Sequence, residues 1–153
     1  PAILCGRQGR AHRPHPLQGL TAMMSVYEAV VARLATLGYT STEADRVSLE
    51  YLIPKCELDI LANINHRELP DGLFYTLVEM AAGQFLFNKK AAGDLEGFDF
   101  DSPVKSITEG DISVTFAGAS DGSSSAESRF DALLDRMMHP PESTLARFRR
   151  LRW

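Results

Sequence analysis

The apolar residues in the middle of the chain recur at every third or fourth position, and this period restricts that stretch to a long helix. The stripe on its expected inner side consists of Leu73, Leu77, Met80, Ala81 and Phe85, widened by Phe74 and Val78. Small residues at 81–83 would let another backbone approach closely. Lys89 and Lys90 suit the negative end of the helix dipole, and Gly93 is a typical residue after a helix. The sequence therefore predicts a helix over about 70–91.

A first helix precedes this one. It begins after Ser25 and carries apolar residues at helical spacing until Gly38, which is expected to end it. Thr40 and Glu43 then have the spacing of a capping box, which predicts the start of a second helix.

The second helix is expected to be interrupted. Its predicted buried side consists of Val47, Tyr51, Leu52, Cys56, Ile60 and Ile64. Pro54 lies inside the pattern, lacks an amide donor and clashes with the preceding turn. We therefore expect two helical pieces, roughly 42–52 and 54–64.

The segment 94–103 is acidic and aromatic. Its acids could suggest calcium, but their spacing is not that of a helix-loop-helix calcium site. We expect a solvated loop with Phe98 and Phe100 turned inward.

Residues 104–116 carry the clearest strand pattern of the chain. Ile112, Val114 and Phe116 alternate with polar residues, and 109–111 supply a turn, which together predict one β-hairpin. A lone hairpin is marginal in water, so it must pack on a helix or pair with another copy of the chain.

The last third of the chain returns to helical spacing. Phe130, Leu133, Leu134 and Met137 form the inner side of a short helix that the prolines at 140–141 break. A final helix is expected to start near Pro141 and to run into the basic end, with Leu145, Phe148 and Leu151 as its apolar stripe.

These elements predict a mainly α fold: a small helical bundle with one projecting β-hairpin and an extended or helical C-terminal tail. Residues 1–22, rich in proline and glycine, are expected to be a disordered leader. Residues 23–138 form the helical domain, and 139–153 form a basic, aromatic tail.

The charge of the chain is unevenly distributed. The net charge is −4, yet residues 1–22 carry +3 and residues 139–153 carry +3. The middle, 23–138, holds nine basic and nineteen acidic side chains, a net −10. Such asymmetry concerns partners more than fold.

Several function classes lack support in the sequence. There is no glycine-rich phosphate loop and no G-x-S-x-G elbow, so we expect no enzyme. No apolar run approaches the roughly 18 residues of a membrane span, and no secretory signal is evident, so we expect a cytosolic origin. Cys5 and Cys56 have no motif spacing, and we expect no disulfide, metal or cofactor.

The segment ARFRRLRW at 146–153 allows three interpretations. It could dock on the protein's own core, insert into another protein, or contact nucleic-acid phosphates. The acidic middle of the chain argues against the last of these.

Five segments in order resemble one family. They are LPDGLFYTLVEMAAGQFLFNKKAAGDL, FDF, VKSITEGDISVTF, ESRFDALLDRMM and LARFRRLRW. Together, over about residues 25–153, the chain resembles the head–tail connector (adaptor) proteins of tailed bacteriophages and prophages of Gram-positive bacteria.

The resemblance implies a virion structural protein of the neck, assembled in the host cytoplasm. Such adaptors form a ring, typically dodecameric, beneath the portal protein, extend the DNA channel and carry the stopper and tail. Genomic DNA passes through the channel without specific binding, and no membrane is involved. The family commonly sends its C-terminal segment into the portal, which here matches Arg147, Phe148, Arg149, Arg150, Leu151, Arg152 and Trp153.

A ring also needs contacts between subunits, and the hairpin edges are the candidate interface. The residues concerned are Val104, Ile107, Ile112, Val114 and Phe116. Two alternatives stay open: a head-closure or tail-completion protein, and a small DNA-binding packaging accessory.

Overall fold

A computed structural model describes residues 24–101 and 125–151, and in these two stretches the chain is mainly α-helical, as predicted. The helices are α2 (Val26–Thr36), α3 (Arg46–Ile64), α4 (Phe74–Ala91), α6 (Ala126–Met138) and α7 (Glu142–Ala146). Two short 3-10 turns, η1 (Glu43–Asp45) and η2 (Asp71–Leu73), lead into α3 and α4. The described residues contain no strand. The predicted leader, 1–22, and the predicted hairpin, 104–116, lie outside them.

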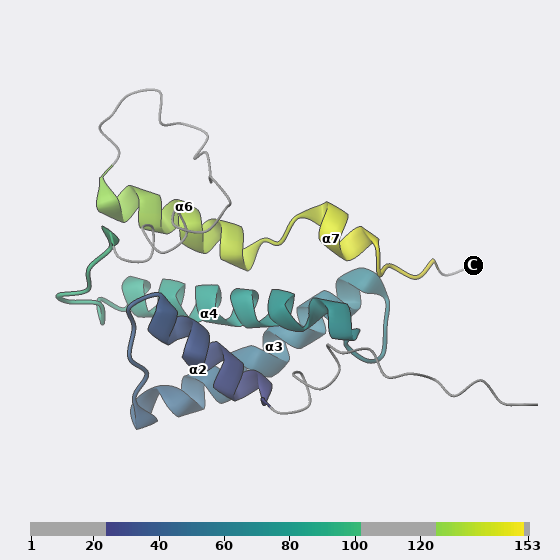
Figure 1. Cartoon of the computed structure of the whole chain (residues 1–153), viewed down its shortest axis with the longest axis horizontal. Helices are drawn as coiled ribbons and strands as arrows, with labels where there is room; N and C mark the ends of the chain where they lie inside the picture. Colours follow the sequence, from purple (N-terminus) through teal and green to yellow (C-terminus); the bar gives the residue numbers. More distant parts are fainter. Residues whose placement is uncertain (1–23, 102–124, 152–153) are drawn as a thin grey trace, which may run out of the picture.

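Helix α4 lies in the middle of the bundle. Helices α2 and α3 pack on one side of it and α6 packs on the other, and α7 packs against α3 (Figure 1). The predicted helix over 70–91 is confirmed, with η2 as its first turn. Leu77, Ala81 and Phe85 are buried, and so are the small residues at 81–83.

The small residues allow α6 to approach α4 closely. A methyl group at Gly83 would lie 2.7 Å from Met137 Cβ, closer than two carbon atoms can come. The predicted inner side of α6 is confirmed, since Phe130, Leu134 and Met137 are buried. Glycine weakens a helix interior, so its presence here reflects this contact.

The ends of α2 follow the sequence. Ser25 caps the helix: its side chain accepts a hydrogen bond from the Glu28 amide, and the Glu28 carboxylate accepts one from the Ser25 amide. At the other end Gly38 has φ +83°, the left-handed conformation that ends helices, as expected.

The turn that leads into α3 is capped two residues later than predicted. Thr42, not Thr40, is the N-cap of η1, and its partner is Asp45 instead of Glu43. The Asp45 carboxylate accepts hydrogen bonds from the backbone amide and hydroxyl of Thr42, at 2.8 and 2.9 Å. Asp45 is buried, and this burial, which depends on tertiary packing, favours the observed pair over the predicted Thr40 and Glu43.

Helix α3 corrects two further predictions. It is continuous from Arg46 to Ile64, although Pro54 lies inside it. Pro54 is on the exposed side of the helix, where the carbonyl that it leaves unbonded can face water. The buried side is Leu49, Leu52, Cys56, Ile60 and Ile64, so Val47 and Tyr51, which were expected inside, face outward.

The acidic loop after α4 folds back as expected. The rings of Phe98 and Phe100 lie 5.4 and 5.2 Å from that of Phe130, which confirms that both phenylalanines turn inward. Arg129 of α6 and Asp101 of the loop form an ion pair at 2.7 Å.

Asp45 is the buried charge of the described core, and it ties η1 to the far end of α4. Lys89 Nζ lies 2.8 Å from one carboxylate oxygen, and the Tyr39 hydroxyl donates to the other at 2.9 Å. Burial alone would raise the pKa of Asp45, but the hydrogen bonds from Lys89, Thr42 and Tyr39 outweigh it and lower the pKa to about 2.

Replacing Gly83 with alanine should destabilise the fold by about 1 to 3 kcal/mol, because α4 and α6 must move apart to admit the methyl group. Helix propensity alone would favour alanine by about 1 kcal/mol. The sign of the change in unfolding free energy therefore distinguishes the close contact from the helix propensity. Chemical denaturation measures it. Ser48→Ala, at an exposed position of α3, is the control and should be neutral or stabilising. Stabilisation by Gly83→Ala would contradict the close contact.

Replacing Asp45 with asparagine should lower stability at pH 7 by about 2 kcal/mol, the free energy that corresponds to a pKa lowered from 3.8 to about 2. A carboxylate with a lowered pKa stabilises the fold above its unfolded pKa, and this contribution disappears as the pH falls through the folded pKa. The stability difference between wild type and Asp45→Asn should therefore shrink between about pH 4 and pH 2. Asp135→Asn, at an exposed position, should show no such trend.

Candidate functional site

The C-terminal segment, residues 142–151 of the described chain, crosses one end of the bundle. Helix α7 is only five residues long and ends at Ala146, so the prediction that it continues as a helix into the basic end is wrong. Amides of Phe148 and Arg149 close a final turn onto the carbonyls of Leu145 and Ala146. The backbone then leaves the helical path, because it bonds to the end of α3 instead.

These bonds cap the C-terminal end of α3. The Arg150 amide donates to the Ile64 carbonyl at 2.9 Å, and the Asn65 side chain donates to the Arg150 carbonyl at 3.1 Å. Arg149 donates to the backbone carbonyl of Asn63 at 3.2 Å and to its side-chain oxygen at 2.6 Å. The last carbonyls of a helix lack partners within it and carry partial negative charge, so an amide and a guanidinium are suited to this place.

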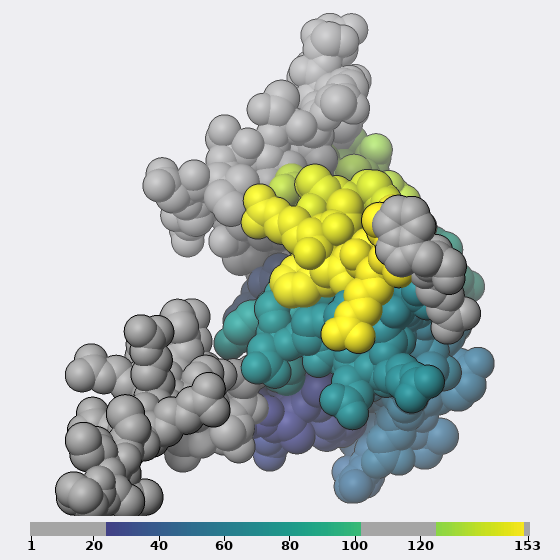
Figure 2. Space-filling view, turned by 90° about the vertical axis from the view of Figure 1, so that its right-hand side faces the viewer, coloured from purple at the N-terminus to yellow at the C-terminus, as the bar shows by residue number. Residues whose placement is uncertain are grey.

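Apolar contacts hold the same segment. Leu145 is buried and belongs to the core of the bundle. The Phe148 ring contacts Gly72 in η2, where a methyl group would come within 2.6 Å of Cζ. Figure 2 shows the segment (yellow) lying on the end of α3 (blue) and the start of α4 (teal).

Other side chains of the segment remain open to solvent. Arg147 and Arg150 are exposed, and the salt bridges of the described residues include neither. Leu151 is 73% exposed, so the expected apolar stripe of Leu145, Phe148 and Leu151 does not exist as one face. The Arg149 side chain, in contrast, forms an ion pair with Glu142 at 2.5 Å in addition to its hydrogen bonds with Asn63.

A groove of about 740 Å³ lies beside this segment. It is lined by the loop between α3 and α4 and by Arg150 and Leu151. The remaining lining residues are Asn65, His66, Arg67, Glu68, Leu69, Pro70 and Asp71. Both signs of charge are present, so the groove suits a polar protein surface better than a single anion.

The predicted partner-binding residues thus divide into three groups. Phe148 and Arg149 contact the chain's own body, whereas Arg147, Arg150 and Leu151 present exposed side chains. Arg152 and Trp153 lie outside the described residues, as do the predicted interface residues Val104, Ile107, Ile112, Val114 and Phe116.

Sequence reasoning missed the residues that receive the segment. Asn63 and Asn65 supply polar groups at the end of α3, and Asn65 adopts a left-handed conformation with φ +58°. Asparagine tolerates this conformation and often ends helices, so the NIN sequence at 63–65 did carry a signal for the end of α3. Nothing local in the sequence links it to Arg149 and Arg150.

The described part of the chain offers no metal site, no membrane-spanning helix and no reactive thiol. No group of three or more His, Cys, Asp or Glu residues there could hold a metal ion. None of the helices in residues 24–101 and 125–151 combines the length and the apolar character needed to cross a membrane. Burial raises the pKa of the Cys56 thiol, which makes it less reactive.

Comparisons of the chain with models of protein families, with curated proteins and with solved structures each give no match. The function therefore has to be proposed from the chain's own residues.

Replacing Phe148 with alanine should destabilise the fold by about 2 kcal/mol, less than for a fully buried phenylalanine, and should speed hydrogen exchange of the Arg150 amide. Gly72→Ala should displace the same ring, so in the wild-type chain it should destabilise the fold by about 1 kcal/mol and speed the same amide exchange. In the Phe148→Ala background, Gly72→Ala should leave the free energy of unfolding unchanged. The two substitutions should therefore be coupled by about 1 kcal/mol. Denaturation and amide exchange measure both. An equal cost of Gly72→Ala in the two backgrounds would show that the ring does not rest there.

Proposed function

We propose that this protein is a virion structural protein, a head–tail connector (adaptor) subunit that forms a ring, typically of twelve copies, on the portal protein. In that role it extends the DNA channel toward the stopper or tail, in the neck of a particle assembled in the host cytoplasm. It needs no cofactor and is not an enzyme. The proposal rests on the resemblance of five segments in order, and the geometry of the C-terminal segment supports it.

The supporting observation is how the C-terminal segment is held. Phe148 and Arg149 fix it to the end of the bundle, so the side chains of Arg147, Arg150 and Leu151 are presented from a supported backbone. Arginine and large apolar residues are favoured at the centres of interfaces, and arginine forms forked bonds with carboxylates. Arg152 and Trp153 follow directly and complete a tip of this composition.

The finer parts of the proposal concern the ring. The projecting β-hairpin 104–116 supplies strand edges that can pair with a neighbouring subunit. The acidic middle of the chain suits a channel through which DNA slides, because phosphates are repelled by carboxylates. A head-closure or tail-completion protein would use the same kind of contacts at another level of the neck.

A DNA-binding packaging accessory is the alternative of a different class. The exposed Arg147 and Arg150 favour it, and the net −10 of residues 23–138 opposes it. Affinity for duplex DNA that falls steeply with salt would support this alternative, because phosphate contacts release counterions. No binding at moderate salt would remove it.

The portal contact can be tested by co-sedimentation with portal rings from the same genome. A chain ending at Leu151 keeps every described contact of the segment but lacks Arg152 and Trp153. It should bind at least about 30-fold more weakly than the full chain, the loss typical of one central aromatic residue in an interface.

The double variant Arg147→Ala and Arg150→Ala should also weaken portal binding, because it removes both exposed guanidinium groups next to the tip. Arg136→Ala, at an exposed arginine of α6, is the matched control and should bind like the wild type. Undiminished binding of the chain ending at Leu151 would show that the contact lies elsewhere. Absence of binding by the full chain would speak against the adaptor role.

A further inference from the structure

Helix α3 is apolar on two opposite sides. Its inner side is buried in the bundle, as described above. Its outer side exposes Val47 (76%), Tyr51 (70%) and Leu58 (66%), with Pro54 between them and Leu61 half-buried at the end. We call these five residues the outer seam. A helix that is apolar all round is typical of one with neighbours on both sides, and in the described chain only the inner side has them.

The spacing of the outer seam matches a helical partner. Val47, Tyr51, Pro54, Leu58 and Leu61 are separated by four, three, four and three positions, the a and d positions of a heptad. Such a seam packs against a second helix with the same spacing, because a and d side chains fit between those of the facing helix.

The described surface offers one seam of this kind. Its other exposed large apolar side chains are Met24, Tyr75, Phe87 and Leu151, and these lie far apart along the chain, on α4 and beside α2 and α7. In a second copy of the chain, the described face that matches the outer seam is therefore the outer seam itself. We propose that two copies pair through these seams, with the α3 helices antiparallel about a two-fold axis.

The charges beside the seam fit this pairing. Lys55 and Asp59 flank one side of it and form an ion pair at 2.9 Å within the helix, with both side chains about half exposed. In an antiparallel two-fold pair, the same side of each helix faces its counterpart. With Leu58 opposite Pro54 of the second copy, each Lys55 comes next to Asp59 of the other chain, so two ion pairs can form across the interface.

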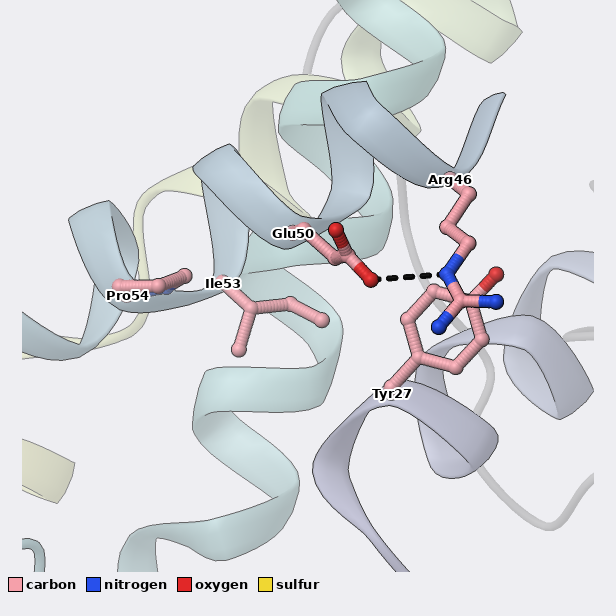
Figure 3. A pocket seen from close by; sticks show the side chains of 5 residues that line it. All are labelled: Tyr27, Arg46, Glu50, Ile53 and Pro54. Atoms are coloured by element: carbon pink, nitrogen blue, oxygen red, sulfur yellow. Dashed lines mark hydrogen bonds and ion pairs between the residues drawn. The ribbon is translucent and has the colours of Figure 1, made fainter. Parts of the chain in front are cut away.

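The other side of the seam is hollowed. A groove of about 340 Å³ lies between α2 and α3, lined by Tyr27, Ile53 and Pro54 and bordered by the Arg46–Glu50 bond at 2.8 Å (Figure 3). The same register brings Leu61 of the second copy to the level of Tyr51, next to Glu50 at the edge of this groove. An apolar side chain can pack there against Tyr27, Ile53 and Pro54, and Arg46 and Glu50 already pair with each other.

The small area of the seam determines the affinity expected between two copies of the chain. Five side chains on one helix bury less than the roughly 1,200 Å² of a standard interface, so the pair should be weak. This inference does not rest on the proposed function, because it concerns the free protein and uses none of the C-terminal segment.

Sedimentation equilibrium of the full chain tests it. The wild-type mass should rise from one chain toward two over roughly 1 to 100 µM, as expected for a weak interface. Tyr51→Glu, which places a charge in the middle of the seam, should keep the mass of one chain throughout. Tyr75→Glu is the matched control, since Tyr75 is 69% exposed on α4, and it should pair like the wild type.

A charge exchange tests the register. Lys55→Glu alone should weaken pairing at least tenfold, because it places two carboxylates side by side in each half of the interface. Adding Asp59→Lys should restore it. Circular dichroism should give the same helix content for all variants, as each changes an exposed side chain.

Four results would overturn the proposal. The first three are a wild-type mass of one chain at every concentration up to about 1 mM, pairing of Tyr51→Glu equal to wild type, and no restoration of pairing by the charge exchange. A wild-type mass of a closed ring that Tyr51→Glu leaves unchanged would overturn it as well.

Discussion

The close contact between α4 and α6 is the constraint on which the rest of the structure depends. α4 contacts α2, α3 and α6, and one helix can do so only if its own side chains leave room. The residues at 81–83 are alanine, alanine and glycine, so α6 approaches to the distance at which the Met137 Cβ lies above the Gly83 backbone. Larger side chains there would separate α6 from α4 and expose Leu134 and Phe130, which are buried against this surface.

Polar contacts then fix the two ends of the bundle. At one end the buried Asp45 carboxylate joins η1, Tyr39 and Lys89, and Lys90 joins α4 to Glu127 and Asp131 of α6. At the other end the C-terminal segment supplies the donors that the last carbonyls of α3 lack. The apolar middle supplies most of the stability, while the polar ends determine which segments lie side by side.

The long elements could be predicted from the sequence because their information is local. The periods of α4 and α6 each define one apolar side, and both sides are buried as predicted. The inner phenylalanines of the acidic loop were also predictable, since two aromatic rings in a polar loop need a place to pack. The boundaries that glycine and serine set, at Ser25 and Gly38, follow from backbone chemistry alone.

The wrong predictions share one physical cause. The local sequence pattern was compatible with more than one structure, and contacts between distant residues determined which structure forms. α3 carries two apolar sides, so its period alone could not show that Leu49 is buried while Tyr51 is exposed. The choice of Thr42 over Thr40 depends on Lys89, forty-four positions after Asp45. The end of α7 depends on the carbonyls of Asn63 and Ile64, which compete successfully for Arg149 and Arg150.

Helix α3 therefore takes part in both proposed contacts, but through separate residues. The outer seam runs from Val47 to Leu61, whereas the C-terminal segment binds at 63–65. The side chains of Val47, Tyr51 and Leu58 in the seam are exposed along α3, and the segment lies across one end of the bundle (Figure 2). A partner held by the tip of the tail would leave the seam accessible, because the two sites share no residue. In these two proposals self-pairing uses α3 directly, whereas portal binding uses the segment that the end of α3 holds, so a change in one need not disturb the other.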